Sequence, residues 1–444
     1  METGKRRSQK PNIILVLCDD LGYGDLGCFG SNTISTPNLD SMAQQGMRMT
    51  DFYASAPWCM PSRKGLMTGV HPYRGGLDNK KILRDGTTLP EMLRTNGYTT
   101  ALLGKWHLGM ENGLHPIDQG FDYYYGTAGS NDPITVSGQL QVYETFKNSR
   151  SETDWPVSLN KNREVIENPA KQSLFTQRYT SEAIQIIEKS QESDTPFFIY
   201  LAHNMPHVPL FASENFLGRS KAGLYGDVVE EIDWSMGQIV KTLEEKGLQD
   251  DTLIIFTSDN GPWVMFKEFG GSAGPLRGEK GTCWEGGPRV PTIFYWPNHI
   301  EAGDSDAFMV NIDIYSTLST LTDSQLPSEY KLDSIDMSEV LLNKKESHRH
   351  SYMFFSGVRS EHYSLPFSLR SDDYKIHFKS GDCIRDPDTY ANMPVTIYDP
   401  PIVFNLKQDI SESTDIAHQD PQLTSKLTNQ YKIMEENLTE TNYP

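Results

Sequence analysis

The chain has 444 residues, of which 37% are hydrophobic and 22% are charged, a composition typical of a globular protein with a large core. Its 59 acidic residues outnumber the 40 basic ones and give a formal net charge of −19, which argues against binding of DNA or RNA through a basic surface. No apolar stretch approaches the roughly 18 residues that a membrane span needs, so we expect no membrane span.

The N-terminus and the cysteines leave the compartment open. Residues 1–7 are polar and lack the apolar middle region of a signal peptide. The cysteines are too few and too scattered for a disulfide framework, and none belongs to a Cys-x-x-Cys pair, which argues against a zinc finger. They are Cys18, Cys28, Cys59, Cys283 and Cys383.

From residue 12 onwards, short apolar stretches alternate with amphipathic ones. Residues 12–18 (NIILVLC) predict a buried strand, and Thr36-Pro37 predicts the start of a helix that is capped by Thr36 and ends at Gly46. The remaining predicted strands cover residues 47–53, 98–103, 196–202, 252–257 and 290–296, and the helices cover 88–96, 176–189 and 226–246. This alternation is typical of a doubly wound α/β sheet.

The pattern changes after about residue 324. Strands predicted at 352–356, 367–370, 374–378 and 402–406 follow one another without long helices, and a helix is predicted at 422–436. We therefore predict a catalytic domain over residues 11–324 and a smaller subdomain over 325–444 that carries an antiparallel sheet. Residues 131–169 are polar and irregular, which favours a long insertion over a site.

Polar residues follow four of the predicted strands directly. They are Asp19 and Asp20, Lys105 and His107, His203 and His207, and Asp259 and Asn260. Each pair alone could be a turn, a helix cap, a surface lysine or a structural histidine. Ligands of open α/β sheets bind beyond the carboxyl ends of the parallel strands, so four clusters at this edge indicate one site.

Three carboxylates and an amide oxygen in these clusters suit a hard cation. Asp19, Asp20, Asp259 and Asn260 offer the oxygen ligands that Ca²⁺ or Mg²⁺ prefers. Without a cation the clustered carboxylates would repel one another.

Cys59 lies in the segment Cys59-Met60-Pro61-Ser62-Arg63. Pro61 fits the first turn of a helix, so Cys59 is expected at a helix N-terminus, where backbone N–H groups favour anions. An isolated cysteine is usually a small buried hydrophobic residue, which is our expectation for Cys18 and Cys28. The Cys-x-Pro-x-Arg spacing sets Cys59 apart.

This segment resembles the signature of the sulfatase family, in which a dedicated enzyme oxidises the cysteine of Cys-x-Pro-x-Arg to formylglycine (3-oxoalanine). Further motifs of the family occur in the family's order over residues 11 to about 300. They are residues 19–25 (DDLGYGD), 36–40 (TPNLD), 104–109 (GKWHLG), 258–261 (SDNG), 278–281 (GEKG) and 284–287 (WEGG). Residues 369–375 and 400–406 resemble the C-terminal region of the arylsulfatase A and N-acetylgalactosamine-6-sulfatase branch.

The resemblance implies an alkaline-phosphatase-like fold and a sulfuric ester hydrolase that acts on a sulfated sugar or an aryl sulfate. It implies one divalent cation, most often Ca²⁺ with Mg²⁺ as the alternative, and a formylglycine-generating enzyme as a partner. The implied metal ligands are Asp19, Asp20, the modified Cys59, Asp259 and Asn260. Val70 departs from the family, whose members usually carry an arginine there that is thought to aid maturation.

The implied catalytic residues are Cys59, Arg63, Lys105, His107, His207 and Lys280. In these roles Arg63 steadies the hydrated aldehyde, Lys105 and Lys280 bind sulfate oxygens, His107 acts as a base, and His207 lies near the leaving oxygen. His203 is expected to be structural or to support the site.

The chemistry of this set is consistent, because fixed cations stabilise the charge that develops on a sulfate ester as its S–O bond breaks. One hydroxyl of the hydrate attacks sulfur and expels the alcohol, which gives a formylglycine-sulfate covalent intermediate. The second hydroxyl, deprotonated by His107, then expels inorganic sulfate as the aldehyde re-forms. An acid near His207 protonates the departing alcohol.

Three alternatives remain open at this point. A phosphatase or phosphonate monoester hydrolase could use the same fold, although the histidine-rich zinc pair of such phosphatases is not seen. A non-catalytic binding protein would have lost a ligand or Cys59, and a structural protein would carry the motifs by chance. Substrate recognition is expected in loops over residues 112–169 and in the C-terminal segment. The resemblance favours a place outside the cytoplasm (periplasmic, secreted or lysosomal), and Asn437-Leu438-Thr439 could accept an N-glycan.

Overall fold

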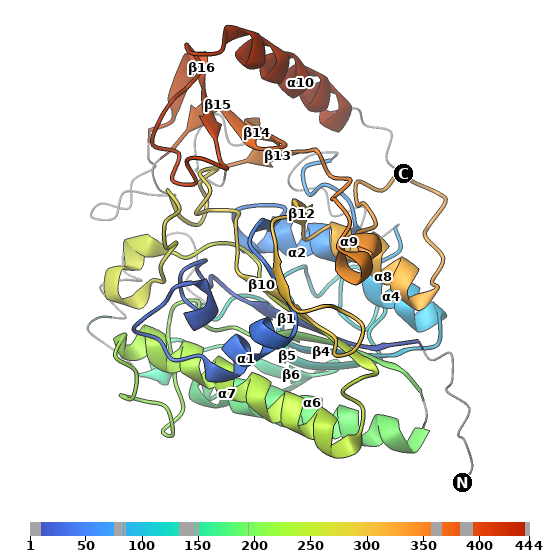
Figure 1. Cartoon of the computed structure of the whole chain (residues 1–444). Helices are drawn as coiled ribbons and strands as arrows, with labels where there is room; N and C mark the ends of the chain where they lie inside the picture. Colours follow the sequence, from blue (N-terminus) through green and yellow to red (C-terminus); the bar gives the residue numbers. More distant parts are fainter. Residues whose placement is uncertain are drawn as a thin grey trace.

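The computed structural model describes residues 10–74, 83, 86–132, 147, 151–193, 195–356, 366–381 and 394–439, apart from the side chains of residues 192 and 439. A large sheet lies between two layers of helices, and a smaller sheet with one long helix packs at one end of it (Figure 1). The predicted arrangement of a mixed, mostly parallel sheet sandwiched by helices, with a small antiparallel sheet near the C-terminus, is confirmed.

Ten strands form the large sheet, and its centre is parallel. In spatial order they are β11 (Gly303–Ser305), β2 (Met47–Met49), β10 (Thr292–Tyr295), β9 (Thr252–Ser258), β1 (Asn12–Cys18), β8 (Phe197–Ala202), β4 (Thr99–Lys105), β5 (Tyr123–Thr127), β6 (Leu159–Lys161) and β7 (Glu164–Glu167). The run β9-β1-β8-β4-β5 is parallel, whereas β10 pairs antiparallel with β9 and β2, and β6 and β7 are antiparallel.

Alternate residues of β1 face different helical layers, as the two-residue period of a strand requires. Ile14 and Val16 pack into the core with α1 (Pro37–Gln45), α6 (Phe175–Ser193) and α7 (Gly223–Lys246). Ile13 and Leu15 pack into the opposite core with α2 (Cys59–Thr68), α4 (Leu89–Thr95), α8 (Asp313–Thr322) and α9 (Ser338–Asn343). Burial on both faces explains why the sequence of this strand is continuously apolar.

The starts of α4 and α1 differ in whether the threonine before the helix caps it. Thr88 and Glu91 form a capping box around Pro90, so α4 begins as the sequence predicts. Thr36 precedes α1, but its side chain does not cap the helix. The Thr36 hydroxyl instead donates to the Asp40 carboxylate at 3.0 Å and accepts from the backbone N–H of Gly27. These two partners take the place of the N–H groups at the start of the helix.

Two predicted segments are divided differently in the structure. The strand predicted over residues 47–53 splits into β2 and β3 (Phe52–Tyr53), and β3 pairs with β12 (Met309–Val310) in a separate sheet. At the break, Arg289 donates to the Thr50 carbonyl at 2.9 Å, next to the buried Asp51. The segment predicted as irregular, residues 131–169, contains a 3₁₀ turn (Glu152–Asp154) and the β6–β7 hairpin, while residues 133–146 and 148–150 lie outside the described part.

The smaller sheet is antiparallel, as predicted. It consists of β13 (Ser351–Phe355), β14 (Pro366–Ser371), β15 (Tyr374–Ser380) and β16 (Thr396–Asn405), and α10 (Pro421–Thr439) covers it (Figure 1). Leu369, Ile376 and Val403 pack against Leu427 and Tyr431 of α10. The same cluster includes Ala56 and Tyr73, so the small sheet also packs on the segments that flank α2.

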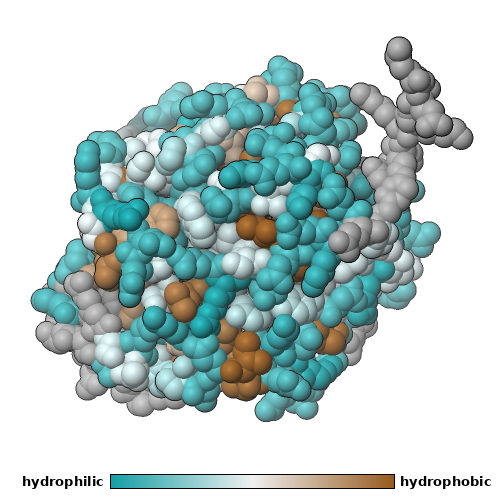
Figure 2. Space-filling view, turned by 90° about the horizontal axis from the view of Figure 1, so that it is seen from below, coloured by the Kyte–Doolittle hydropathy of each residue, from teal (hydrophilic) through white to brown (hydrophobic). Residues whose placement is uncertain are grey.

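One face of the molecule shows the character of its surface. The face seen in Figure 2 is largely hydrophilic, with small and separate hydrophobic patches. No helix in the described part of the chain is long and apolar enough to cross a membrane.

Candidate active site

The three predicted carboxylates and Asn260 meet at the ends of two neighbouring strands. Asp19 and Asp20 follow β1 directly, and Asp259 and Asn260 follow β9. The last residues of these strands, Cys18 and Ser258, are partners in the parallel ladder. All four site residues are at most 2% exposed, and one potential ligand atom from each of Asp19, Asp259 and Cys59 lies within 4.8 Å of the others.

The chemistry of these side chains fits a divalent cation. The Asn260 amide nitrogen donates to Asp20 Oδ1 at 2.7 Å, while Asn260 Oδ1 and Asp19 Oδ1 are buried without a hydrogen-bond partner among the described residues. Burial, together with the neighbouring carboxylate of Asp19, raises the pKa of Asp259 to about 7. A bound cation would give the two unpartnered oxygens a partner and would offset the repulsion between the carboxylates. Hard oxygen ligands suit Ca²⁺ or Mg²⁺.

Three cations surround the carboxylates. Lys105, the last residue of β4, places Nζ 2.6 Å from Asp19 Oδ2, and Lys280 places Nζ 2.8 Å from Asp20 Oδ2. Arg63 Nη2 lies 2.8 Å from Asp259 Oδ2, and Nη1 donates to the Lys105 carbonyl. Burial would lower the pKa of each lysine, but the adjacent carboxylates outweigh it and raise both, so the lysines remain charged.

Cys59 is the first residue of α2 and is 8% exposed. Arg63 is four residues further along the helix and therefore lies on the same side of it. Burial raises the pKa of the Cys59 thiol, although Lys105 and Lys280 oppose the effect. The unmodified thiol is thus protonated and a poor nucleophile.

Two of the predicted histidines border the same cluster. His107, just beyond β4, has a positive φ of 62°, and burial together with Lys105 lowers its pKa far below the usual value, so its ring is neutral. His207 Nε2 lies 3.6 Å from Asp20 Oδ2 and 3.4 Å from Ser130 Oγ. Burial lowers the pKa of His203 to about 3, and neither of its ring nitrogens has a partner among the described residues, so this ring is neutral too.

Comparisons with known proteins place this site in a family. The family model "Sulfatase" matches residues 11–324, and the model "C-terminal region of aryl-sulfatase" matches residues 347–442. The chain belongs to the sulfatase family. It is 36% identical over 437 residues to arylsulfatase A of Bos taurus, covering 94% of this chain and 85% of the relative. It is 33% identical to arylsulfatase G of Rattus norvegicus, covering 97% and 87%.

A solved structure gives the same result. The crystal structure of PsFucS1 sulfatase from Pseudoalteromonas sp. superposes with a TM-score of 0.83 at 30% identity, covering 98% of this chain and 92% of that one. The protein is therefore a sulfuric ester hydrolase with an alkaline-phosphatase-like fold, and the predicted family, fold class and reaction are confirmed. A metal ion and formylglycine are general properties of this family, and the buried acidic cluster of this sulfatase could hold the ion.

Two further side chains lie beside the cations of the sulfatase: Trp263 was not predicted from the sequence, and Glu279 was named only as part of the motif at residues 278–281. The Trp263 ring lies 4.2 Å from Lys280 Nζ and 5.6 Å from the His207 ring, measured to the ring centroid. Glu279 is buried and accepts from the backbone N–H of Met265 at 2.8 Å. Trp263 follows the Ser258–Gly261 motif by two residues, which is the signal that could have drawn attention to it.

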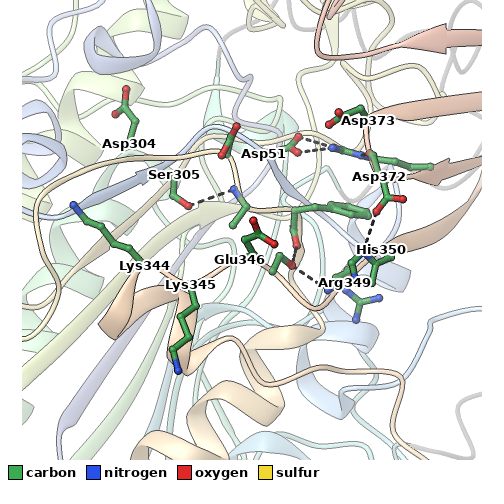
Figure 3. Close-up of a pocket in the computed structure, with 15 residues that line it drawn as sticks. Asp51, Asp304, Ser305, Lys344, Lys345, Glu346, Arg349, His350, Asp372 and Asp373 are labelled. Atoms are coloured by element: carbon green, nitrogen blue, oxygen red, sulfur yellow. Dashed lines mark hydrogen bonds and ion pairs between the residues drawn. The ribbon is translucent and has the colours of Figure 1, made fainter.

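A separate cleft of about 390 Å³ lies between the large sheet and the small one (Figure 3). Its charged side chains bind one another: Asp51 binds Arg370 at 2.5 Å, and His350 Nδ1 lies 2.9 Å from Asp372 Oδ1. None of the predicted catalytic residues lines this cleft. The Asp51–Arg370 pair joins the segment between β2 and β3 to the small sheet, which is a structural role.

Beyond that cleft, buried ion pairs connect the segment after Lys280 to the small sheet. Glu285 lies 2.7 Å from Lys375 of β15 and 3.0 Å from Arg289, and the exposed fractions of the Glu285 and Lys375 side chains are zero. Burial alone would raise the pKa of Glu285, but the attraction of Lys375 and Arg289 lowers it to about 2. Glu412 binds His377 at 2.6 Å and accepts from the Glu285 backbone N–H at 2.6 Å.

Substitution of Lys375→Met is expected to destabilise the sulfatase by about 3–5 kcal/mol, because it leaves the buried charge of Glu285 with one partner fewer. Thermal unfolding followed by circular dichroism measures the effect as a lower Tm. Lys344→Met is the matched control, since Lys344 pairs at the surface with Glu301, which is 76% exposed on its side chain. It should change stability by no more than about 0.5 kcal/mol. Equal losses in the two variants would contradict the assigned role of Lys375.

Proposed function

We propose that this sulfatase hydrolyses the sulfate monoester of a sugar or an aryl alcohol with residue 59, in its formylglycine form, as the nucleophile. One observation carries the proposal: Cys59 stands at the N-terminus of α2, where Lys105, Lys280 and Arg63 surround a group of buried carboxylates. A sulfate group is the kind of anion that such a cluster of cations can hold in a chain whose net charge is negative.

The carboxylates and the amide are proposed to hold Ca²⁺. Asp19, Asp20, Asp259 and Asn260 supply the oxygens, and residue 59 lies within reach of the same ion. When bound, the ion supplies positive charge beside the transferring sulfate group. Asn260 is oriented for this role, because its amide nitrogen is engaged by Asp20 and its oxygen is left for the ion.

Each cationic side chain has a distinct place in the proposed reaction. Lys105 and Lys280 bind the non-bridging oxygens of the sulfate ester, and Arg63 steadies the hydroxyls of residue 59. Lys105 and Arg63 are fully buried and Lys280 is 5% exposed, which strengthens their interaction with an anion because water is excluded.

Proton transfers are assigned to His107 and to an acid next to His207. As the bond between sulfur and the bridging oxygen breaks, an acid next to His207 protonates the departing alcohol. His107 takes the proton of the second hydroxyl of residue 59 when inorganic sulfate leaves. Its ring is neutral because of burial and the adjacent Lys105, and a neutral imidazole is the form that a base requires.

A panel of sulfated monosaccharides tests the substrate class, with released inorganic sulfate as the readout. Turnover of one or more of these sugars supports the proposal. Hydrolysis of 4-nitrophenyl sulfate with no release from any sugar restricts the substrate to aryl esters.

We expect kcat/KM for 4-nitrophenyl sulfate to exceed that for 4-nitrophenyl phosphate. A phosphate monoester is mostly dianionic near neutral pH and places more negative charge beside Asp19, Asp20 and Asp259 than a sulfate ester does. Parallel steady-state assays with the same leaving group measure the ratio. A preference for phosphate would instead favour a phosphatase or phosphonate hydrolase on this fold.

Three further expectations from the sequence belong to the proposal. A formylglycine-generating enzyme oxidises Cys59, the protein works outside the cytoplasm, and the chain divides into a catalytic domain over residues 11–324 and a subdomain over 325–444. The division is supported by the two separate sheets, and limited proteolysis with mapping of the cleavage sites tests it.

A further inference from the structure

We propose that Trp263 is a positioning residue for Lys280, which it holds toward the sulfate site through the face of its indole ring; this inference rests on the proposed role of Lys280 in binding sulfate. Lys280 Nζ contacts Asp20 Oδ2 at 2.8 Å and lies 4.2 Å from the centroid of the Trp263 ring. The second distance is well within the range of a cation–π interaction.

The flexibility of the lysine side chain explains why Lys280 needs the Trp263 ring as well as Asp20 to hold its position. An ammonium group has three N–H donors, and its four-carbon stem is flexible. Asp20 alone would draw Lys280 toward the carboxylates. It also belongs to the set proposed to hold a divalent cation, and a carboxylate whose charge is offset by a metal attracts an ammonium less strongly. The indole ring has no charge that a metal could offset, so its attraction persists.

The loop that carries Trp263 is itself fixed to the segment around Lys280. The Lys280 backbone N–H donates to the Pro262 carbonyl at 2.9 Å, and the buried Glu279 accepts from the Met265 N–H. The Gly281 N–H donates to the Pro57 carbonyl at 2.6 Å, two residues before Cys59. Trp263 therefore belongs to a set of contacts that fixes the position of the Lys280 ammonium relative to the N-terminus of α2.

The test measures the affinity for inorganic sulfate, in addition to turnover. The full-length Cys59→Ala protein, saturated with calcium, is titrated with sulfate in a calorimeter, and Trp263→Phe and Trp263→Leu are compared in this background. We expect sulfate binding to weaken about 5- to 30-fold in Trp263→Leu, the factor that 1–2 kcal/mol of lost cation–π attraction represents. Trp263→Phe keeps an aromatic face, so its affinity for sulfate should fall less than that of Trp263→Leu. In the matured enzyme with 4-nitrophenyl sulfate, Ki for sulfate should rise in parallel.

A double-mutant cycle separates positioning from packing, because Trp263 also contacts Phe266 at a centroid distance of 4.5 Å. In a Lys280→Met background, Trp263→Leu should change sulfate affinity less than about 2-fold if the indole acts through Lys280. Trp234→Leu is the matched control: Trp234 lies on α7 against Phe216, 5.9 Å away, and its loss should leave sulfate affinity unchanged.

Two results would overturn the inference. One is an unchanged sulfate affinity in Trp263→Leu. The other is an equal loss of sulfate affinity on Trp263→Leu in the parent protein and in the Lys280→Met background. If Trp263→Leu fails to fold, the same cycle with Trp263→Met decides, because methionine fills space without an aromatic face. Failure of the proposed function looks different, since the parent protein with an intact Trp263 would then bind no sulfate at all.

Discussion

The variant Cys59→Ser, made in a host whose maturation machinery oxidises only cysteine, is expected to lose turnover by roughly 10⁴- to 10⁶-fold, the range that removal of a nucleophile or its partner costs in other hydrolases. The serine would keep one hydroxyl beside Lys105 and Arg63 and could attack sulfur once. It has no second hydroxyl to expel sulfate, so a serine sulfate ester should accumulate.

Intact-protein mass spectrometry after exposure to substrate should show one added SO₃ group on the serine variant. The unexposed wild-type protein should show the mass loss that conversion of a thiol to an aldehyde produces. Cys59→Ala is the control, because it has no hydroxyl and should acquire no adduct. Repeated turnover of the serine variant at a rate close to wild type would falsify the two-hydroxyl mechanism.

Removal of divalent metal is expected to abolish activity and to lower Tm. Asp19, Asp20 and Asp259 are buried together, and burial, with added repulsion from Asp19, raises the pKa of Asp259 to about 7. A ligand present at 100 times its Kd stabilises a protein by about 2.7 kcal/mol, so the apo protein should melt several degrees lower. Exhaustive chelation, followed by differential scanning calorimetry and a sulfate-release assay, measures both effects.

Addition of Ca²⁺ should restore both properties, and Asn260→Ala should raise the calcium concentration needed, because it removes an oriented oxygen ligand. A substitution at the distant surface pair, Lys344→Met, should leave the calcium requirement unchanged. Full activity of a preparation in which elemental analysis finds no divalent metal would refute the requirement.

The central strands and the site at their ends could be predicted from the sequence because their signals are local. A run such as residues 12–18 is apolar throughout since both of its faces are buried, and the polar residues that follow it mark the carboxyl end of a parallel strand. The same reasoning brought Asp19, Lys105 and Asp259 together. In the structure Lys105 forms an ion pair with Asp19, and Asp259 pairs with Arg63 of the same cluster.

Contacts between distant segments could not be predicted in this way. Glu285 and Lys375 are 90 residues apart, and no periodicity in either segment indicates that they form a buried pair. At the point where residues 47–53 divide, Thr50 contacts Arg289, which lies more than 200 residues further on. Trp263 was missed for a similar reason, since a single aromatic residue after a motif is more often part of a core than of a site.

The burial of Cys59 has a consequence for the order of events in the cell. Residue 59 is only 8% exposed and lies beside the buried Asp19 and Asp259, so little of it is open to a second protein once the chain has folded. Under the proposed maturation, oxidation of Cys59 would therefore have to compete with folding, and a molecule that folds first would keep a protonated thiol. The fraction of active molecules in any preparation would then reflect the rate of the oxidising enzyme during synthesis, and later addition of that enzyme to the folded protein would not raise it.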